Sequence, residues 1–342
     1  MTGSGTSGPE ASAPLLRVEG LTIDFPAGEG RVAVVRDVSL AVGRRELVGL
    51  VGESGSGKSL TALALLKLVP PPGRIAAGRV LLEGEDVLAL SEPRLRRVRG
   101  RRIAMVFQEP ATALNPVYSI GFQVAEAVRA HRPLSRRAAR EEAVRLLDLV
   151  ALPDPRRRLA DYPHQLSGGQ RQRVMIAMAL AAGPDLLLAD EPTTALDVTV
   201  QAQILELLER LRQELGLSVL LITHDLAVVA ETCERVIVMY CGEVVEEAAV
   251  GDLFARPAHP YTRALLAALP RLGAPAARGR LPAVPGQVPD PANRPSGCAF
   301  HPRCPEVFAP CPAVVPPLYA LPGGRTARCL LHDPAVVSGA TA

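Results

Sequence analysis

Residues 52–59 read Gly52-Glu53-Ser54-Gly55-Ser56-Gly57-Lys58-Ser59. A short apolar run precedes this stretch and a segment of helical pattern follows it, which is the strand–loop–helix context of a phosphate-binding P-loop. The glycines let the backbone approach phosphate groups, and loop N–H groups and the helix N-terminus then point at negative charge. We expect Lys58 to bridge the β- and γ-phosphates of a nucleotide and the Ser59 hydroxyl to bind Mg²⁺. The structural alternative is a plain glycine turn between a strand and a helix.

Two adjacent carboxylates, Asp190 and Glu191, end a second apolar strand expected at residues 186–189. Parallel strands deliver their C-terminal side chains to the ligand crevice of an α/β sheet, so both groups are candidates for chemistry. Asp190 suits the Mg²⁺ shell through water, and Glu191 suits the polarisation of an attacking water molecule. The alternative is a helix N-cap or a solvated acidic turn.

Two further polar residues follow predicted strands. Gln108 comes after the apolar residues 103–107 and can offer its amide oxygen to the metal or to the attacking water. His224 follows residues 218–223 and can contact the γ-phosphate. Each would be an ordinary polar residue on its own, and only its place in the series makes it a site candidate.

A glycine-rich helix start lies between these motifs, at Gln165-Leu166-Ser167-Gly168-Gly169-Gln170. Such a start can bind an anion, although it can also be a simple N-cap. It cannot reach a phosphate held on its own P-loop unless two such domains face each other. The sequence therefore predicts a second ATPase domain as an obligatory partner.

Composition restricts the class of protein further. The chain has 342 residues, 48% of them hydrophobic, and a formal charge of +3, which is too small to argue for nucleic acid. It contains no run of about 18 apolar residues, so we expect no transmembrane helix. Residues 1–14 are rich in small and polar residues and lack an apolar segment, which predicts a disordered tail and no signal peptide.

The pattern along the chain predicts an α/β protein with additions. Antiparallel strands are expected at residues 15–25 and 31–42, a helical region at about 113–182, and strand–helix alternation after Pro184 that gives a parallel sheet. Beyond Pro270 the composition changes to Pro, Ala and Gly with four cysteines, which suggests a separate small module. The predicted domains are the tail at 1–14, an ATPase domain at 15–269 and a C-terminal extension at 270–342.

Together these residues closely resemble the ATP-binding cassette (ABC) family over residues 15–268. The resemblance implies a P-loop NTPase fold with a RecA-like core, an antiparallel β-subdomain and a helical subdomain. It makes residues 52–59 the Walker A loop, Gln108 the Q-loop glutamine, residues 166–170 the signature, Glu191 the catalytic glutamate and His224 the switch histidine. Two cassettes in this family sandwich two ATP molecules, each between one P-loop and the opposite signature.

Residue by residue, the resemblance implies catalytic roles for Glu191, His224 and Gln108, and Mg²⁺ contacts for Ser59, Gln108 and Asp190. The residues implied in binding ATP are Phe25 as the adenine-stacking aromatic, Gly52, Glu53, Ser54, Gly55, Ser56, Gly57, Lys58, Ser59 and Leu60 in the P-loop, Ser167, Gly168, Gly169 and Gln170 in the signature, and Asp197 in the D-loop.

A narrower resemblance is to the ATPases of the dipeptide/oligopeptide and nickel importers. It rests on Phe107-Gln108-Glu109-Pro110, on Leu114-Asn115-Pro116, on His259-Pro260-Tyr261-Thr262 and on the tail motif Phe300-His301-Pro302-Arg303-Cys304. It implies import of dipeptides or oligopeptides energised by ATP at the cytoplasmic face of the membrane. The implied partners are a second ATPase subunit, identical or homologous, two transmembrane permease subunits and an extracytoplasmic solute-binding protein, with no nucleic acid.

Three alternatives stay open on the sequence. The same machinery could import nickel or another small solute, the chain could be a non-transport ABC ATPase acting on ribosomes or DNA, or it could be an iron–sulfur redox sensor with a vestigial ATPase. We also expect residues 109–120 to carry closure of the site to a permease, with Leu114 as an apolar contact.

The four C-terminal cysteines, Cys298, Cys304, Cys311 and Cys329, are separated by five, six and seventeen residues. Disulfides are not expected in a cytosolic ATPase, and the lack of a CxxC pair weakens the interpretation as a zinc site. The importer resemblance implies a [4Fe–4S] cluster on these thiolates. Zinc and unligated or oxidised thiols are the alternatives.

Overall fold

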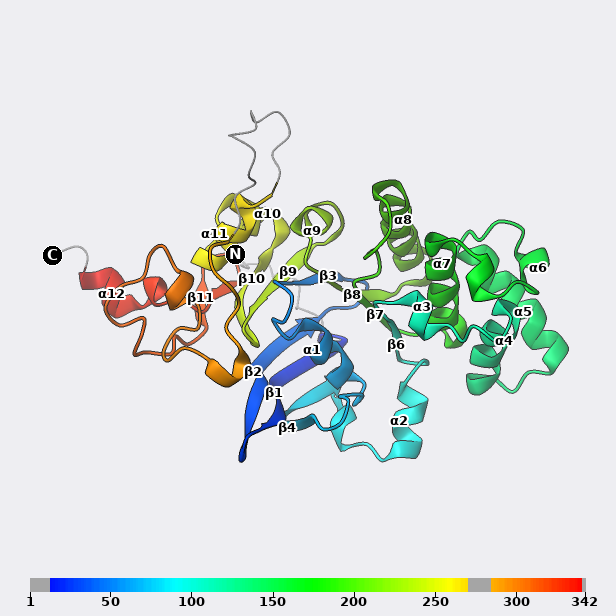
Figure 1. Cartoon of the computed structure of the whole chain (residues 1–342), viewed down its shortest axis with the longest axis horizontal. Helices are drawn as coiled ribbons and strands as arrows, with labels where there is room; N and C mark the ends of the chain where they lie inside the picture. Colours follow the sequence, from blue (N-terminus) through cyan, green and yellow to red (C-terminus); the bar gives the residue numbers. More distant parts are fainter. Residues whose placement is uncertain (1–12, 270–283, 340–342) are drawn as a thin grey trace, which may run out of the picture.

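The computed structural model describes residues 13–269 and 284–339. The tail predicted for residues 1–14 therefore lies outside the described residues except for its last two. Figure 1 shows a central sheet flanked by helices, an antiparallel sheet next to α1, a group of helices at one end and a C-terminal extension at the other.

The chain forms twelve strands and twelve α-helices within the described residues. The strands are β1 (Leu16–Ala27), β2 (Gly30–Val42), β3 (Leu47–Val51), β4 (Arg74–Leu82), β5 (Glu85–Asp86), β6 (Ile103–Val106), β7 (Leu186–Asp190), β8 (Ser218–Thr223), β9 (Arg235–Tyr240), β10 (Glu243–Ala249), β11 (Tyr319–Leu321) and β12 (Arg325–Ala327). The helices are α1 (Lys58–Leu65), α2 (Glu92–Val98), α3 (Pro110–Ala113), α4 (Ile120–His131), α5 (Arg136–Leu149), α6 (Pro155–Arg158), α7 (Gly168–Ala179), α8 (Val198–Leu215), α9 (Leu226–Thr232), α10 (Val250–Ala255), α11 (Pro260–Ala267) and α12 (Pro334–Gly339).

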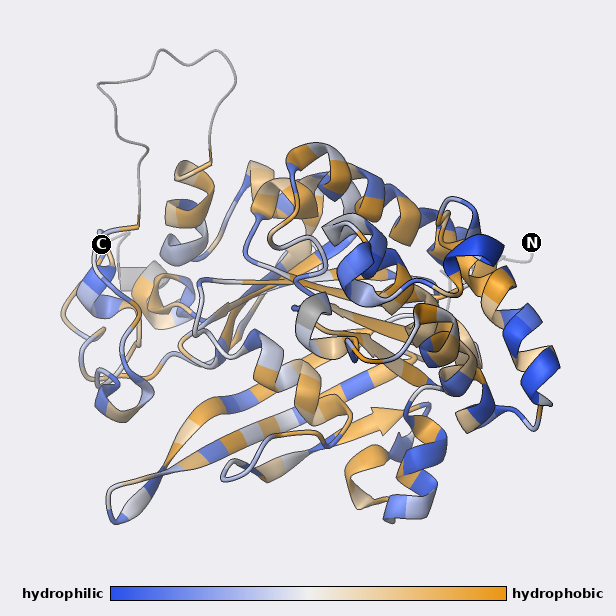
Figure 2. Cartoon of the chain, turned by 45° about the vertical axis from the view of Figure 1, so that its right-hand side comes forward, coloured by the Kyte–Doolittle hydropathy of each residue, from blue (hydrophilic) through white to orange (hydrophobic). Residues whose placement is uncertain are grey.

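The central sheet has the strand order β11-β12-β10-β9-β3-β8-β7-β6. Its strands β6, β7, β8, β3 and β9 run parallel, and β3, β7 and β8 are buried along their whole length. Near-continuous apolar runs are typical of parallel strands covered on both faces. In Figure 2 these strands form an apolar layer between helices of mixed polarity.

The register of this sheet places the ends of four strands at one edge. Val51 pairs with Thr223, Asp190 pairs with Ile222, and Val106 pairs with Ala189. The loops that follow β3, β6, β7 and β8 therefore begin side by side. These are the loops in which the sequence predicts the nucleotide chemistry.

A second sheet, of order β2-β1-β4-β5, is antiparallel. Strands β1 and β2 form the hairpin predicted from residues 15–42, paired from Leu16 with Val42 to Ala27 with Gly30. Strand β4 was not predicted, and it pairs with the other side of β1. One apolar cluster joins this sheet to α1 and to the central sheet, so the P-loop helix packs against both.

Helices α3 to α7 form the helical subdomain, whose apolar cluster is shared with β6, β7 and α8. Serine side chains cap three of its helices, since Ser119, Ser135 and Ser167 each accept a backbone N–H from the first turn of α4, α5 and α7. Such a cap typically stabilises a helix by about 1 kcal/mol. Leu114 is 1% exposed and belongs to this cluster, so it is a core residue of the subdomain and does not offer a permease the apolar contact that we expected.

The C-terminal extension is joined to the central sheet. Strand β12 pairs with β10, through Glu246 with Ala327, and β11 pairs with β12. Phe300 is 1% exposed in an apolar cluster with Tyr240 of β9 and Tyr261 of α11. The boundary at residue 270 stays a prediction, but the described part of the extension shares a sheet and a core with the ATPase domain.

Candidate nucleotide-binding and catalytic site

The P-loop between β3 and α1 needs its glycines. Gly55 has φ 80° and Gly57 has φ 98°, in the left-handed region that favours glycine. At Gly52 a Cβ atom would lie 2.2 Å from the Met239 carbonyl oxygen, so a side chain would clash with β9. These three positions fix the backbone curve that directs loop N–H groups inward.

Lys58 opens α1 with its side chain buried under this loop. Its Nζ donates to the carbonyl oxygens of Gly52 at 2.8 Å and Glu53 at 3.0 Å. Burial lowers the pKa of the Lys58 ammonium, while the carboxylates of Glu191 and Asp190 oppose that shift. The cation is therefore held at the loop by fixed acceptors, and the carboxylates at the end of β7 favour its charge.

Ser59 and Asp190 meet across the gap between α1 and β7. The Ser59 hydroxyl donates to Asp190 Oδ1 at 3.0 Å, and Asp190 is 5% exposed. Burial raises the pKa of Asp190 and the charge of Glu191 adds to this shift, whereas the Ser59 hydrogen bond and Lys58 oppose it. A hydroxyl and a carboxylate side by side are the oxygen donors that Mg²⁺ shares with substrate phosphates, so these residues fit the ion.

Glu191 contacts the two other predicted catalytic residues, Gln108 and His224. Its Oε2 accepts from the Gln108 amide at 2.9 Å and from the Thr194 hydroxyl at 2.8 Å, and its Oε1 lies 3.1 Å from His224 Nδ1. Burial raises the pKa of Glu191, but the hydrogen bonds from Thr194 and His224 outweigh it and the net pKa is lowered. The lowered pKa favours the ionised carboxylate, and the three contacts fix its orientation.

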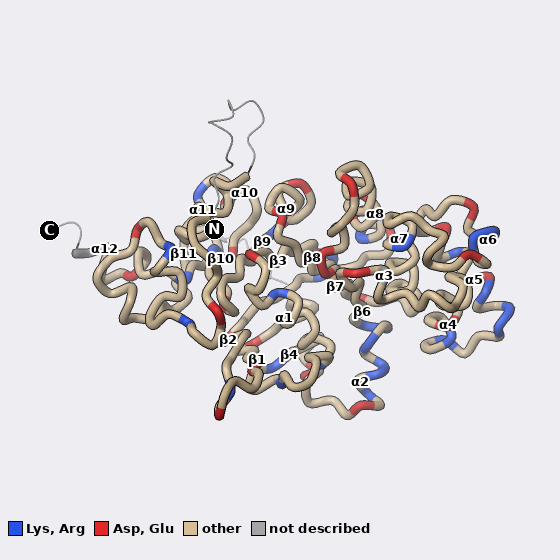
Figure 3. The backbone as a smooth tube through the Cα atoms, in the orientation of Figure 1, with Lys and Arg blue, Asp and Glu red and all other residues tan. Residues whose placement is uncertain are grey.

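The structure thus brings six predicted residues to one edge of the sheet: Lys58, Ser59, Gln108, Asp190, Glu191 and His224. In Figure 3 acidic residues gather in this region, around the labels of β7 and β8. Their roles in catalysis and in Mg²⁺ binding stay predictions, and their proximity is what those roles require.

Phe25 and Leu60 lie on the antiparallel side of the P-loop. Phe25 is half-buried near the end of β1, and its ring packs so closely on Gly73 that a Cβ there would lie 2.4 Å from Cζ. Leu60 is half-buried in α1 and packs against the same apolar cluster as Phe25. Adenine stacking on Phe25 stays a prediction.

The signature forms the start of α7, as expected. Ser167 and Gln170 make a capping box, in which Ser167 Oγ accepts the Gln170 N–H and Gln170 Oε1 accepts the Ser167 N–H. A Cβ at Gly169 would lie 2.5 Å from Val200 Cγ1, so the signature packs closely on α8. Figure 1 shows α7 well apart from α1, so the signature does not face its own P-loop.

The D-loop residue Asp197 caps α8. Its Oδ1 accepts the Val200 N–H at 2.9 Å, and its neighbour Leu196 packs close to Gly168 of the signature. The signature and the D-loop therefore form one surface of the monomer, and the P-loop lies on another part of it.

The [4Fe–4S] expectation for the four C-terminal cysteines is wrong. The four side chains line one small cavity, but no group of three or more His, Cys, Asp or Glu residues in the described chain is arranged to hold a metal ion. Burial raises the pKa of Cys298, Cys304 and Cys329, the last to about 11. With no metal bound, buried groups of this kind are neutral thiols.

Two residues of this site were missed in the sequence. Thr194 donates to Glu191, and the Tyr261 hydroxyl accepts the Glu53 N–H at 2.9 Å. Thr194 lies three residues after Glu191, where a hydroxyl can turn back to the carboxylate, so the local sequence carried a weak signal. Tyr261 is 208 residues from Glu53, and no local pattern could link them.

The fold and this arrangement of side chains define an ATP-binding cassette ATPase. The family described as ABC transporter matches residues 35–194, and the family described as the C-terminal region of oligopeptide/dipeptide transporters matches residues 245–311. The chain is 52% identical over 319 residues to a protein of Brucella abortus named as a peptide import ATP-binding protein, covering 93% of this chain and 95% of the relative. A similarly named protein of Brucella ovis is 50% identical over 327 residues, covering 93% and 97%.

The chain therefore belongs to the ATP-binding subunits of the dipeptide/oligopeptide importer branch of the ABC transporter family. As a member of this family it is an ATP hydrolase. Among solved structures, the dimeric cassette MJ0796 in a post-hydrolysis state with ADP and Pi gives a TM-score of 0.62 at 32% identity, covering 69% of this chain and 98% of that one. The protein cbiO1 of Clostridium perfringens, part of the transporter complex cbiONQ, gives 0.61 at 26% identity, covering 71% and 91%.

The names of these relatives agree with the interpretation of the chain as a transporter ATPase. They do not support the alternatives of a non-transport ATPase or a redox sensor. Within residues 13–269 and 284–339, no helix combines the length and the apolar character needed to cross a membrane.

Proposed function

We propose that this chain hydrolyses ATP to energise the import of dipeptides or oligopeptides through a membrane permease. The observation that carries the proposal is the Glu191 carboxylate, held by Gln108, Thr194 and His224 beside the Ser59–Asp190 pair. The substrate class is supported by relatives at about 50% identity that are named for peptide import, and by the match of residues 245–311 to the oligopeptide/dipeptide transporter region.

In the proposed reaction, P-loop N–H groups and Lys58 bind the triphosphate, and Ser59 and Asp190 are the residues that would hold Mg²⁺. The ion supplies charge neutralisation at the β- and γ-phosphates when it is bound. Glu191 orients and polarises the attacking water, and its lowered pKa keeps it in the deprotonated form that this role needs. Gln108 and His224, which contact the two oxygens of Glu191, link this base to the helical subdomain and to the loop after β8.

We further propose that two ATPase subunits pair head to tail, so that the signature of one closes over the P-loop of the other. The separation of α7 from α1 in the monomer supports this, because the signature has no nucleotide of its own to contact (Figure 1). The dimeric state of MJ0796, which holds ADP and Pi, supports it as well.

The permease is proposed to dock on the helical subdomain. Val117, Tyr118 and Phe122 are 70%, 47% and 49% exposed, and the rings of Tyr118 and Phe122 stack 4.8 Å apart. Val117 and Tyr118 lie on the segment between α3 and α4, and Phe122 lies in the first turn of α4. An exposed aromatic patch on a loop that follows a site residue is suited to sense nucleotide and contact a partner.

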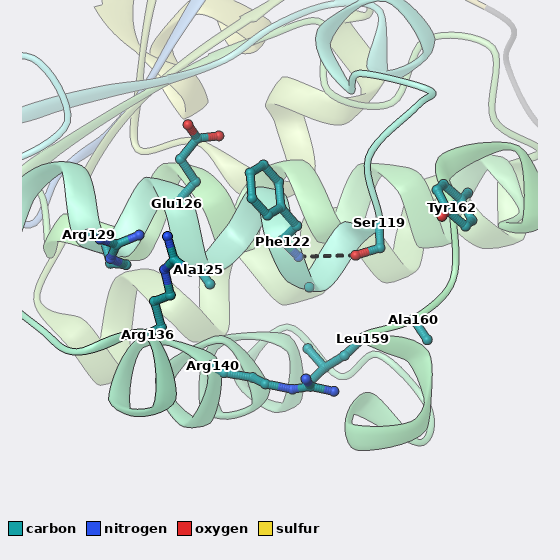
Figure 4. Close-up of a pocket in the computed structure, with 11 residues that line it drawn as sticks. Ser119, Phe122, Ala125, Glu126, Arg129, Arg136, Arg140, Leu159, Ala160 and Tyr162 are labelled. Atoms are coloured by element: carbon teal, nitrogen blue, oxygen red, sulfur yellow. Dashed lines mark hydrogen bonds between the residues drawn. The ribbon is translucent and has the colours of Figure 1, made fainter.

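A hollow of about 750 Å³ adjoins this aromatic patch, between α4, α5 and the segment before the signature. Figure 4 shows Phe122 and Glu126 on α4, with arginines from α4 and α5 along the hollow and Tyr162 at its other end. The lining arginines are Arg129, Arg136 and Arg140. This combination fits a short permease segment that offers apolar side chains together with carboxylates or helix-end carbonyls. We also propose that the chain works at the cytoplasmic face of the membrane and that a solute-binding protein belongs to the same transporter.

Peptide uptake in proteoliposomes tests the function directly. The chain is assembled with the permeases and the ATPase encoded beside it, with MgATP on the side of the ATPases. We expect uptake of a labelled dipeptide or tripeptide that stops when ATP is omitted. ATP-driven uptake of Ni²⁺ alone, with no peptide transported, would overturn the substrate class.

The docking surface is tested by Phe122→Asp, with Val315→Asp as a matched control on the C-terminal extension, where Val315 is 57% exposed. A charge on a buried apolar contact costs several kcal/mol. We expect Phe122→Asp to abolish uptake while the isolated subunit binds MgATP normally. Normal uptake by this variant would place the docking surface elsewhere.

A further inference from the structure

We propose that Arg303, in the C-terminal extension, is a positioning residue of the nucleotide site that holds the P-loop through Glu53. The extension would then be a working part of the ATP-binding machinery. This inference rests on the proposed assignment of residues 52–59 as the nucleotide-binding loop.

The contact between Arg303 and Glu53 is bidentate and shielded from water. Arg303 Nη1 donates to Glu53 Oε2 at 2.8 Å and Nη2 donates to Oε1 at 3.0 Å, across 250 residues of sequence. The side chain of Arg303 is 5% exposed and that of Glu53 is 27% exposed. Bidentate Arg–carboxylate pairs are among the strongest side-chain hydrogen bonds and also fix geometry.

The surroundings of Arg303 use every donor of a guanidinium group. Besides the two bonds to Glu53, Nε donates to the Pro285 carbonyl at 2.7 Å, Nη2 to the Val284 carbonyl at 3.3 Å and Nη1 to the Tyr240 hydroxyl at 3.4 Å. The group therefore has five acceptors for its five N–H donors. A lysine ammonium has three donors and no planar fork, so this position is built for arginine.

Packing fixes the direction of the Arg303 side chain. The guanidinium carbon lies 5.7 Å from the centroid of the Tyr240 ring and 6.0 Å from that of Phe300, and these two rings pack edge to face at 5.2 Å. The Arg303 N–H donates to the Phe300 carbonyl at 3.0 Å, which closes the turn that carries the side chain. Arg303 is thus anchored at both its backbone and its charged end.

Both backbone polar groups of Glu53 are hydrogen-bonded. Its N–H donates to the Tyr261 hydroxyl at 2.9 Å, and its carbonyl oxygen accepts from Lys58 Nζ at 3.0 Å and from the Ser56 N–H at 3.2 Å. Arg303 therefore binds the side chain of a residue, Glu53, whose backbone carbonyl accepts a hydrogen bond from the P-loop lysine, Lys58. Displacing Glu53 would move an acceptor of Lys58.

The pair also has an electrostatic consequence. Glu53 places a carboxylate on the loop that has to hold a triphosphate, and like charges at short range repel strongly where water is partly excluded. In the proposed arrangement Arg303 neutralises this carboxylate and does not itself bind the phosphates. Loss of Arg303 should therefore weaken nucleotide binding twice, through a looser loop and through an unpaired negative charge.

Binding of MgATP to the full-length chain tests the proposal, measured by calorimetry for Arg303→Ala, Arg303→Lys, Glu53→Gln and the double variant Arg303→Ala/Glu53→Gln. We expect Arg303→Ala to raise the Kd for MgATP about tenfold, from the loss of a charge-assisted pair beside an anion site. Arg303→Lys should recover little of this. The double variant should bind more tightly than Arg303→Ala, because the repelling carboxylate is gone, and this recovery is the readout that a merely structural role would not produce.

The matched control is Arg294→Ala. Arg294 also joins the extension to the sheet, through an ion pair with Glu243 whose side chains are 11% and 12% exposed and through a hydrogen bond to the Cys241 carbonyl, and neither partner belongs to the P-loop. We expect this control to lower the melting temperature while leaving the Kd for MgATP unchanged. If Arg303→Ala does not fold, Arg303→Gln carries the same comparison with more of the side chain retained.

Three outcomes would overturn the inference: unchanged MgATP affinity in Arg303→Ala and Arg303→Gln, equal weakening in Arg294→Ala, or no recovery in the double variant. Failure of the unmutated chain to bind MgATP would instead refute the proposed nucleotide site. In the assembled transporter, Arg303→Ala should raise the KM for ATP and leave kcat close to the unmutated value.

Discussion

Glu191 adopts a left-handed backbone conformation, with φ 45°, directly after β7. A non-glycine residue there costs about 1–3 kcal/mol, and such strain persists only where the surroundings enforce it. The Glu191 N–H donates to the Ile222 carbonyl at 2.9 Å, so pairing with β8 holds the residue in place. The strained turn aims the carboxylate at the hydroxyl and ring nitrogen that orient it.

We expect Glu191→Gln to bind MgATP with unchanged affinity and to lose about 10²–10⁴-fold in turnover, since an amide cannot act as a base. ATP hydrolysis by the assembled complex and nucleotide binding by the isolated subunit measure the two effects. The variant should also accumulate as an ATP-bound dimer. Hydrolysis at the unmutated rate would show that the base is another group.

The pH dependence of turnover tests the role of Thr194. The lowered pKa of Glu191 keeps the base deprotonated to lower pH than an ordinary glutamate, and the Thr194 hydrogen bond is the largest contribution that lowers it. Thr194→Val removes that bond, so the Glu191 pKa should rise and the acidic limb of kcat should move to higher pH. Thr232→Val, which removes a hydroxyl bonded to the Val228 carbonyl in α9, is the control. An unmoved acidic limb would contradict the assignment.

The sequence identified Lys58, Gln108, Glu191 and His224 because each follows a predicted strand in a parallel sheet, and such a sheet brings strand ends to one edge. The hydrogen bonds among these side chains could not be predicted from the sequence. The contact of Gln108 with Glu191 spans 83 residues and depends on the register of β6 and β7. Glu53 was predicted as a nucleotide-binding residue, but its partner Arg303 could be recognised only in three dimensions.

At the scale of elements, the start of α7 combines a capping box with two glycines. The capping box satisfies N–H groups within the chain, while the glycines that follow Ser167 leave the helix end without bulky side chains. A helix start of this kind is suited to bind an anion supplied by another subunit.

Ser167→Arg tests this role of α7. A bulky cation at the helix start should block ATP-dependent association of two subunits, while MgATP binding to the isolated monomer stays normal. Sedimentation or light scattering with and without ATP, using the Glu191→Gln background to prevent turnover, measures the association.

The matched control is Ser135→Arg. Ser135 caps α5 as Ser167 caps α7, so both variants lose a cap of about 1 kcal/mol. Ser135→Arg should associate normally. Equal loss of monomer affinity for MgATP in Ser167→Arg would place the signature in its own chain's pocket and contradict the sandwich.

Some elements were predictable and others, such as β4, were not, for a physical reason. Strands β1 and β2 alternate apolar and polar residues around a turn, and β7 and β8 are continuous apolar runs. Strand β4 has mostly exposed residues and a glycine, Gly78, at φ 100° in its centre, so its sequence carries little strand pattern. It forms because β1 offers it a free edge, which is a tertiary effect.

At the scale of the whole molecule, the C-terminal extension was predicted to be a separate module because it is rich in proline and poor in apolar residues. Its strands β11 and β12 have only three residues each, below the length at which periodicity can be recognised. Strand β12 pairs with β10 and β11 pairs with β12, while Phe300 of the extension packs against Tyr240 and Tyr261. The described part of the extension and the ATPase domain therefore share one apolar cluster.

Phe300→Ala should destabilise both parts of the protein together. A fully buried phenylalanine truncated to alanine costs about 3–5 kcal/mol, and Phe300 is 1% exposed. Because its neighbours Tyr240 and Tyr261 belong to the ATPase domain, we expect calorimetry to show one unfolding transition at a Tm lower by roughly 6–20 °C, at 2–4 °C per kcal/mol. Val315→Ala, at a residue 57% exposed, should change stability by no more than about 0.5 kcal/mol. Two separate transitions, with the one that MgATP stabilises left at its original temperature, would show instead that the extension folds independently of the nucleotide site.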